Sequence, residues 1–196
     1  MERYLRPTAR NSYFTGKLLL AMPFLEDIQF SQSVIYVCGH DSQGAIGLIV
    51  NKKIPNLTFK DLVVQLHLKN DYAENFKNFE VHYGGPIEIT RGFVLHSNDY
   101  FISSTVAVDQ NFSVTSTLEI LRALSQNRGP QNFLVCLGYT GWSPGQLESE
   151  VQDNHWMVVE ANDNLLFETS LSEKWRNSMA TIGVDPMVLS IDSGHA

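Results

Sequence analysis

The 196-residue chain contains only two cysteines, and neither lies in a pattern typical of a metal site or a disulfide framework. Cys38 and Cys136 each lie inside an apolar run, which favours buried, reduced thiols over a disulfide. Cys38-Gly39-His40 offers one close pair of potential ligands, but the second pair that a four-ligand zinc site needs is missing. We therefore expect no bound metal.

Long apolar runs are also missing, because no stretch approaches the 18 or so residues of a transmembrane helix. The basic N-terminus is followed by a short apolar run at 18–22, but Pro23, Glu26 and Asp27 end it well short of a signal sequence. We therefore expect a cytoplasmic protein with no membrane partner.

Positive charge is scarce outside the N-terminus. The whole chain has 14 basic and 21 acidic residues, a net charge of −7, whereas residues 1–17 alone carry +3 and the remaining 179 carry −10. Such a body repels a phosphate backbone, and no pair of expected helices has helix-turn-helix spacing. We expect no direct DNA binding, and we expect residues 1–15 to form a basic, mobile arm.

The usual nucleotide cradles are absent as well. The sequence has neither G-x-x-x-x-G-K-[ST] nor G-x-G-x-x-G, and it lacks the H-E-x-x-H motif of zinc hydrolases. We therefore expect no cofactor, and a kinase or a dehydrogenase has no support.

What the chain does have is a composition typical of one folded domain spanning residues 1–196: 43% hydrophobic and 11% aromatic residues. Alternating or continuous apolar patterns predict strands at 18–22, 33–38, 46–50, 79–83, 92–96, 105–108, 112–115, 133–139, 156–160 and 165–168. Strands outnumber helices and several precede the first helix, so the pattern favours a mixed α+β domain over βαβ alternation. A turn at 40–44 is predicted to join two of the strands as a hairpin.

Helical periodicity is found in three segments. Phe59, Leu62, Val63 and Leu66 follow Thr58 at helical spacing, and a second series of leucines follows a capping box at 116–119. A third helix is predicted between Ser170 and Gly183, with one face formed by Trp175, Met179 and Ile182. His82 and His96 alternate with apolar neighbours and are expected to be strand residues whose rings have hydrogen-bond partners.

The segment Gly141-Trp142-Ser143-Pro144-Gly145 matches the G-x-S-x-G pattern of a nucleophile elbow. The elbow needs the backbone N–H of the residue after the serine, and Pro144 has none. The alternative explains more residues: Ser143 as N-cap, Pro144 in the first turn and Gln146 completing a capping box of a helix that starts at residue 144. The same loop could receive an anion, but Glu148 and Glu150 would oppose it.

Three blocks of sequence carry a family resemblance. They read SVIY, HD and GAIGLIVN within 33–51, YGGP and RGFVLH within 83–96, and GYTGWSPGQLESE followed by NHW within 138–156. Together they resemble the YqgE/AlgH family of bacterial proteins, from about Gly16 to the C-terminus. The resemblance implies an α+β fold with a small barrel-like, bifurcated, mostly antiparallel sheet flanked by helices. Family members are often labelled transcriptional regulators, and the family offers no catalytic residues to transfer.

The blocks also suggest where a binding surface lies, since each places glycines or a turn beside polar or aromatic groups. The candidate binding residues are His40, Asn51, Gly84, Gly85, Pro86, His96, Gly141, Trp142, Gly145, Gln146 and Glu148. Each also has a structural explanation: turn geometry for the glycines, core packing for Trp142 and Trp156, and a local backbone hydrogen bond for Asn51.

We assign no catalytic residue. The reading favoured by the sequence is a non-catalytic regulatory or protein-interaction domain. The alternative is a small-molecule-binding domain or hydrolase that uses the 141–145 loop. The expected partner is accordingly a protein or a small molecule.

Overall fold

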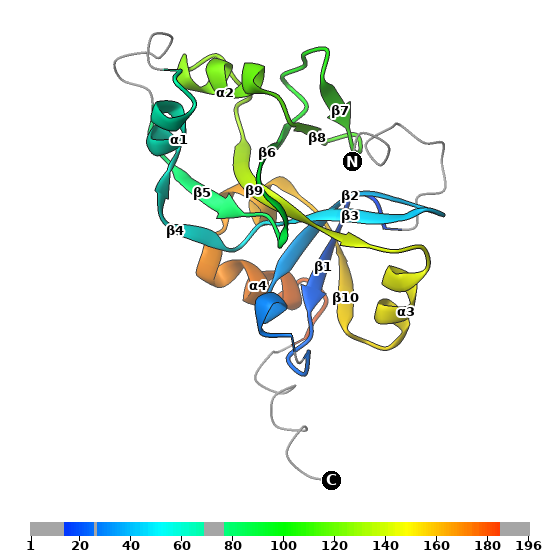
Figure 1. Ribbon diagram of the computed structural model, residues 1–196. Helices are drawn as coiled ribbons and strands as arrows, with labels where there is room; N and C mark the ends of the chain where they lie inside the picture. Colours follow the sequence, from blue (N-terminus) through cyan, green and yellow to red (C-terminus); the bar gives the residue numbers. More distant parts are fainter. Residues whose placement is uncertain (1–13, 26, 69–76, 185–196) are drawn as a thin grey trace.

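The computed structural model describes residues 14–25, 27–68 and 77–184 (Figure 1). The strands are β1 (Lys17–Ala21), β2 (Val34–Asp41), β3 (Gly44–Ile49), β4 (Lys53–Thr58), β5 (Glu80–Tyr83), β6 (Ile87–Ser97), β7 (Thr105–Ala107), β8 (Phe112–Thr115), β9 (Phe133–Trp142) and β10 (Trp156–Glu160). The helices are α1 (Phe59–Gln65), α2 (Leu118–Ser125), α3 (Gln146–Gln152) and α4 (Leu171–Ala180), with a 3-10 turn η1 (Ile28–Phe30) and a π-helical turn η2 (Asn164–Glu168).

The strands form one curled, mostly antiparallel sheet that divides at β9. The main path runs β10-β1-β2-β3-β9-β6-β8-β7, and a branch leads from β9 through β5 to β4. Residues 140–142 of β9 pair with β3, whereas residues 133–137 pair with β6 on one side and, at 136–137, in parallel with β5 on the other. The expected α+β fold with a bifurcated, barrel-like sheet is confirmed.

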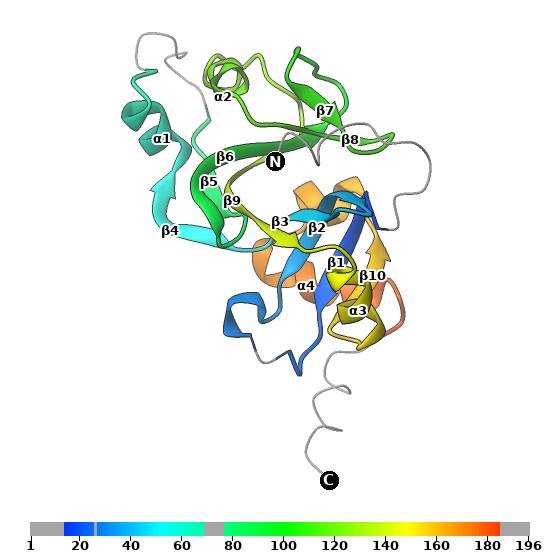
Figure 2. The same cartoon turned by 45° about the vertical axis from the view of Figure 1, so that its right-hand side comes forward.

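The helices cover different parts of this sheet (Figures 1 and 2). In one apolar cluster, Phe59 of α1 and Leu121 of α2 pack with Val94 and Val135 of the sheet. A second cluster joins Trp175 and Met179 of α4 to the first strands. A third joins Leu147 of α3 to Trp142, Trp156 and β1–β2 residues such as Leu19 and Ile35. Helices α1 and α2 therefore share one section of the core, whereas α3 and α4 each contribute apolar side chains to another.

Most of the predicted elements are confirmed, with shifted ends. The strand expected at 92–96 begins earlier, at Ile87, and β9 continues to Trp142. The 40–44 hairpin forms, with Asp41 opposite Gly44. Both cysteines are free and buried. In the described part of the chain, no helix is long and apolar enough for a bilayer crossing.

The strand predicted at 165–168 is wrong, because these residues form the π-helical turn η2. The side chain of Asn162 accepts a hydrogen bond from the Leu165 amide, and the Thr169 amide donates to the Asn164 carbonyl five residues earlier. These polar contacts close a wide turn in which Leu165 and Leu166 still reach the core. The apolar run therefore contributes to the core without being extended.

The start of the helix after the 141–145 segment is also corrected. The helix begins at Gln146, with Gly145 rather than Ser143 as its N-cap. Gly145 has φ 76° and ψ −8°, and the Gln146 amide donates to the Ser143 carbonyl over 3.0 Å. Pro144 and Gly145 therefore occupy the two central positions of a type II turn. This turn forms in place of the predicted capping box. Only half of that box remains: Gln146 Oε1 accepts from the Ser143 amide at 2.9 Å.

Other ends differ in smaller ways. The box at 116–119 is not formed, since α2 begins at Leu118 with Thr117 as N-cap and without a side-chain cap. Leu66 and Ile182, expected on buried helix faces, are exposed. Strand β4 was missed because it contains Pro55, half of its residues are polar and none of them is buried. Residues 1–13 of the expected mobile arm lie outside the described residues.

Candidate functional site

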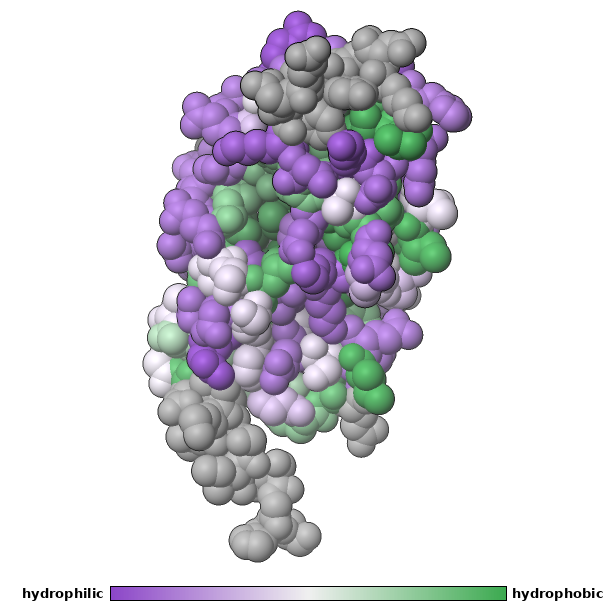
Figure 3. Space-filling view, turned by 90° about the vertical axis from the view of Figure 1, so that its left-hand side faces the viewer, coloured by the Kyte–Doolittle hydropathy of each residue, from purple (hydrophilic) through white to green (hydrophobic). Residues whose placement is uncertain are grey.

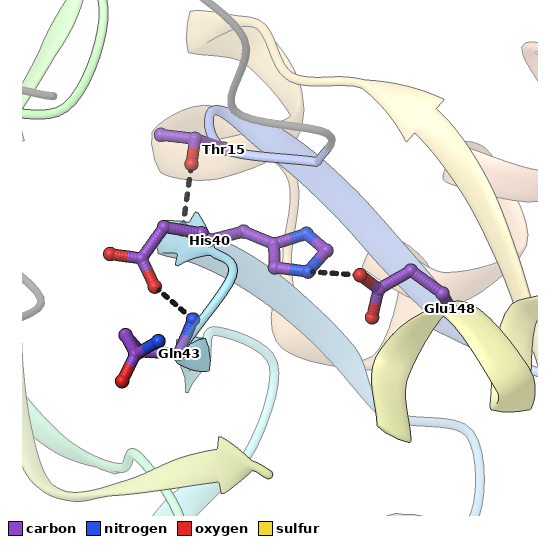
Figure 4. A network of polar contacts seen from close by, with 5 residues as sticks. Thr15, His40, Gln43 and Glu148 are labelled. Carbon is purple, nitrogen blue, oxygen red and sulfur yellow. Dashed lines mark hydrogen bonds and ion pairs between the residues drawn. The ribbon is translucent and has the colours of Figure 1, made fainter. Parts of the chain in front are cut away.

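The β2–β3 hairpin and the start of α3 bring several candidate residues together (Figure 4). His40 lies near the end of β2 with its side chain fully buried, and its Nε2 is 3.3 Å from Oε1 of Glu148 on α3. Thr15 Oγ1 accepts a hydrogen bond from the His40 amide at 2.8 Å, and the Phe14 ring stacks on the imidazole at 5.3 Å. The hairpin, α3 and the segment before β1 thus meet at His40.

The end of β9 lies against the same hairpin. Gly141 and Trp142 are paired with Ile46 and Ala45 of β3. The Trp142 indole is buried and donates to Glu150 Oε2 at 2.7 Å, while Gln146 donates to the other oxygen of Glu150 at 2.8 Å. Six candidates therefore share one region: His40, Gly141, Trp142, Gly145, Gln146 and Glu148. The Trp142 indole is used there for packing.

The serine of the 141–145 segment is exposed at this end of the molecule. Its amide is bonded to Gln146, and the next residue is a proline without an N–H. Residue 144 therefore has no N–H to donate to an oxyanion formed at Ser143. The arrangement lacks the donor that a nucleophile elbow supplies.

Gly84 and Gly85 lie where β5 ends against β9, and both are buried. A Cβ atom on Gly84 would lie 2.3 Å from the Gly138 carbonyl oxygen, and one on Gly85 would lie 2.3 Å from the Tyr139 carbonyl. The Gly84 amide donates to the Leu137 carbonyl, and its own carbonyl accepts from the Ile49 amide. These glycines permit a close crossing of the backbone, and Pro86 after them is exposed.

Asn51 lies at the open end of the β2–β3 hairpin, away from His40, and His96 lies on β6. Both bond to their own surroundings. Asn51 Oδ1 accepts from the Val34 amide and its Nδ2 donates to the Gln32 carbonyl, both at 2.8 Å. The buried His96 ring contacts Thr115 Oγ1 and the Ser97 carbonyl, each at 2.9 Å, and burial lowers its pKa. The candidate residues therefore do not form a single continuous surface.

His82 is the exception to the expectation for the strand histidines. Its ring is buried, and Nδ1 has no hydrogen-bond partner among the described residues. Sequence alternation placed the residue correctly on a strand and gave no indication of this unpaired nitrogen.

Sequence reasoning missed an apolar groove of about 310 Å³ between α1, α2 and β6. Leu66, Ile89 and Leu118 are among its lining residues and are 39%, 60% and 47% exposed. Figure 3 views the side on which α1, β4 and β5 lie, where apolar surface is set between hydrophilic side chains. Leu66 and Leu118 both lie in the segments of helical periodicity, and this pattern does not distinguish an exposed apolar residue from a buried one.

Metal coordination has no candidate in the part of the chain that the structure describes. No group of three or more His, Cys, Asp or Glu side chains is arranged there to hold an ion. Burial raises the pKa of Cys136 to about 12 and also raises that of Cys38, so both thiols stay protonated at neutral pH.

Solved structures show the same fold. The solution structure of the AlgH protein from Pseudomonas aeruginosa matches with a TM-score of 0.75 and 32% identity, covering 97% of this chain and 100% of that one. The crystal structure of protein DIP2367 from Corynebacterium diphtheriae matches with a TM-score of 0.69 and 18% identity, covering 96% and 95% of the two chains.

Curated relatives match over nearly the whole chain. A UPF0301 protein of Rhodopseudomonas palustris (strain HaA2) is 43% identical, covering 97% of this chain and 90% of its own. One from Methylocella silvestris is 45% identical, covering 94% and 93%. The sequence profile of the family described as AlgH-like matches residues 18–187. The chain therefore belongs to the AlgH-like family, as its three sequence blocks indicated.

Proposed function

We propose that this chain is a non-catalytic interaction domain that binds an apolar segment of a partner protein in the groove between α1 and α2. The observation that carries this proposal is the gathering of exposed aliphatic side chains, Leu66, Ile89 and Leu118, along one groove. Single exposed apolar residues are ordinary on protein surfaces, whereas a contiguous group at a groove is typical of a binding site.

The β6 side of the groove supports an extended partner segment. The β6–β9 ladder shifts register between Ile87 and Gly92, so residues 88–91 have no register partner on β9. Glu88 has φ 47°, which bends the strand at this point. A partner segment could therefore combine apolar contacts in the groove with main-chain hydrogen bonds to β6.

The net charge of the body favours basic residues in the partner. The helices of the groove carry both signs, Lys60 and Asp61 on α1 and Glu119 and Arg122 on α2. The surrounding body, residues 18–196, is strongly acidic. We infer a segment with apolar anchors and lysine or arginine flanks, and a regulatory effect would act through that protein rather than through DNA.

Photocrosslinking would test the groove. Replacing Ile89 by the photoreactive p-benzoylphenylalanine should capture one partner segment, whereas the same replacement of Ile28, which is exposed on η1, should not. A synthetic peptide of the captured sequence should bind the purified chain. Leu118→Glu should weaken that binding about tenfold or more, or 1.4 kcal/mol. Identical adducts at both positions, or binding unaffected by Leu118→Glu, would contradict the proposal.

Small-molecule binding is a second candidate for the same groove. Its volume of about 310 Å³ is at the lower end of ligand pockets, and Gln65 and Thr115 add polar groups to its walls. Native mass spectrometry of the purified chain would favour this candidate if it revealed a retained compound that Leu118→Glu releases. The hydrolase alternative would require labelling of Ser143 by a fluorophosphonate, and we expect none.

A further inference from the structure

A second cavity lies between β5 and the segment formed by η2 and α4, and Val135 is the only described lining residue that it shares with the groove. Its volume is about 620 Å³. Its lining includes Lys77, Glu80, His82, Thr169, Ser170 and Lys174. Two of these polar side chains, Lys174 and His82, are buried at its wall. Both retain hydrogen-bonding capacity that the described residues do not use.

Lys174 is a lysine of α4 that is only 1% exposed. Its Nζ donates to the carbonyl oxygens of Leu165 and Leu166 in η2, each at 2.6 Å. An ammonium group has three protons, so one donor remains after these two bonds. Burial lowers the pKa of Lys174 to about 8, so the ammonium group is protonated in most molecules at neutral pH.

His82 on β5 is 8% exposed and has the complementary capacity. Burial, followed by the charge of Lys174, lowers its pKa to about 4, so the imidazole is neutral at pH 7. Its buried Nδ1 has no hydrogen-bond partner among the described residues. In the tautomer protonated at Nε2, Nδ1 carries a lone pair and accepts a hydrogen bond.

The carboxylates around this cavity do not neutralise Lys174. Glu80 forms an ion pair with Lys53, and Glu168 accepts from Asn164 Nδ2 at 3.0 Å. In the part of the chain that the structure describes, Lys174 has no carboxylate partner. The wall therefore combines one buried cation that can donate once more with one neutral acceptor.

We propose that this cavity binds a small hydroxycarboxylate, whose carboxylate accepts from Lys174 Nζ and whose hydroxyl donates to His82 Nδ1. A monoanion balances the single buried ammonium. A phosphate dianion would bring a second charge and need more donors, close to Glu80 and Glu168. This inference is independent of the groove and of the function proposed for it.

The test uses lactate as the probe and propionate, which lacks the hydroxyl, as its matched control. Binding is followed by NMR shifts of the His82 ring and by calorimetry of the purified chain. We expect saturable binding of lactate and about tenfold weaker binding of propionate, because only lactate satisfies Nδ1. Inorganic phosphate should bind more weakly than lactate.

Variants then separate the two contacts. His82→Phe should lower lactate affinity to that of propionate and leave propionate binding unchanged, and Lys174→Met should remove binding of both. Because Lys174→Met also leaves two carbonyls without their donor, the comparison of the two acids on the unmodified chain stands as an independent readout. Leu118→Glu, in the groove, should leave lactate binding unchanged.

Three results would overturn the inference. They are the absence of saturable shifts at His82 with lactate, equal affinities for lactate and propionate on the unmodified chain, and a structure in which a water molecule bridging Lys174 Nζ and His82 Nδ1 persists in saturating lactate. The last would assign the two groups to an internal hydration site.

Discussion

Trp142 and Trp156 donate their indole N–H groups to the same atom, Oε2 of Glu150, each over 2.7 Å. The two rings meet edge to face with centroids 6.0 Å apart. One side chain of α3 thereby joins the end of β9 to the start of β10. Gln146 bonds the second carboxylate oxygen, so both oxygens of Glu150 have partners.

Glu150→Ala should lower the free energy of unfolding by about 2 kcal/mol, because two largely buried indole donors lose their acceptor. Glu150→Gln keeps one acceptor oxygen and should cost less. Glu173, whose contact with Arg176 is exposed, provides a control, and Glu173→Ala should cost about 0.5 kcal/mol or less. Urea denaturation followed by circular dichroism measures all three, and equal losses for both alanine variants would refute the shared-acceptor role.

Gly84→Ala should destabilise the chain by about 3 kcal/mol, at the upper end of overpacking costs, since the new methyl would collide with the Gly138 carbonyl. Gly92 on β6 is the matched control, because a Cβ there meets only Leu137 Cδ2 at 3.9 Å. Gly92→Ala should be nearly neutral in thermal denaturation. Similar losses at the two positions would show that the close crossing with β9 is not rigid.

Gly145→Ala should cost about 1 to 2 kcal/mol, because the type II turn holds residue 145 in a left-handed conformation. No heavy atom lies within 4 Å of a Cβ there, so the cost is conformational. Ser143→Ala should change stability by about 0.5 kcal/mol or less, as expected for an exposed residue outside the cap. A loss of about 1 kcal/mol at Ser143 would restore the N-cap interpretation.

The pKa of His82 predicts loss of stability in mild acid. Its folded pKa is about 4, below the ordinary histidine value of 6.5, so between these values the unfolded chain binds more protons. Stability should therefore fall as the pH drops from about 6.5 to 4, by about 2 to 3 kcal/mol from this residue. The difference in unfolding free energy between pH 7 and 4.5 should shrink in His82→Phe. His96 has a shift in the same direction and should supply part of what remains.

Duplex DNA should bind weakly and without sequence preference, with a Kd above about 1 μM at physiological salt. Fluorescence anisotropy with two unrelated duplexes measures this. A chain beginning at Phe14 should bind still more weakly, because the removed residues carry most of the excess positive charge of the N-terminus. Nanomolar, sequence-dependent affinity would overturn the prediction.

Apolar periodicity was enough to predict most strands, because burial on both faces leaves continuous runs such as those of β2, β3 and β9. It could not predict η2, where an equally apolar run closes into a turn because the Asn162 side chain accepts from the Leu165 amide and Lys174 donates to the Leu165 carbonyl. The lysine is eight or nine residues from the carbonyls that it binds. No local pattern reports such a contact.

The grouping of the candidate residues also depends on contacts between distant parts of the sequence. His40 and Glu148 are 108 positions apart, and they meet because β3 pairs with β9. Sequence blocks identified both without indicating that they pair. The groove at Leu118 depends on which side of a periodic helix remains uncovered. The binding proposed for the cavity at His82 depends on a ring nitrogen that has no partner among the described residues of the folded structure. Both are properties of assembled elements.

The division of the sheet at β9 has a consequence for how the molecule folds and melts. β9 supplies hydrogen bonds to β3 at one end and to β5 and β6 at the other, and it follows all of them in the chain. Neither half of the sheet can complete its ladders before residues 133–142 pair with it. Formation of the sheet therefore depends on contacts between distant parts of the sequence. Loss of β9 opens both halves together, which makes the sheet one cooperative unit rather than two independently melting parts.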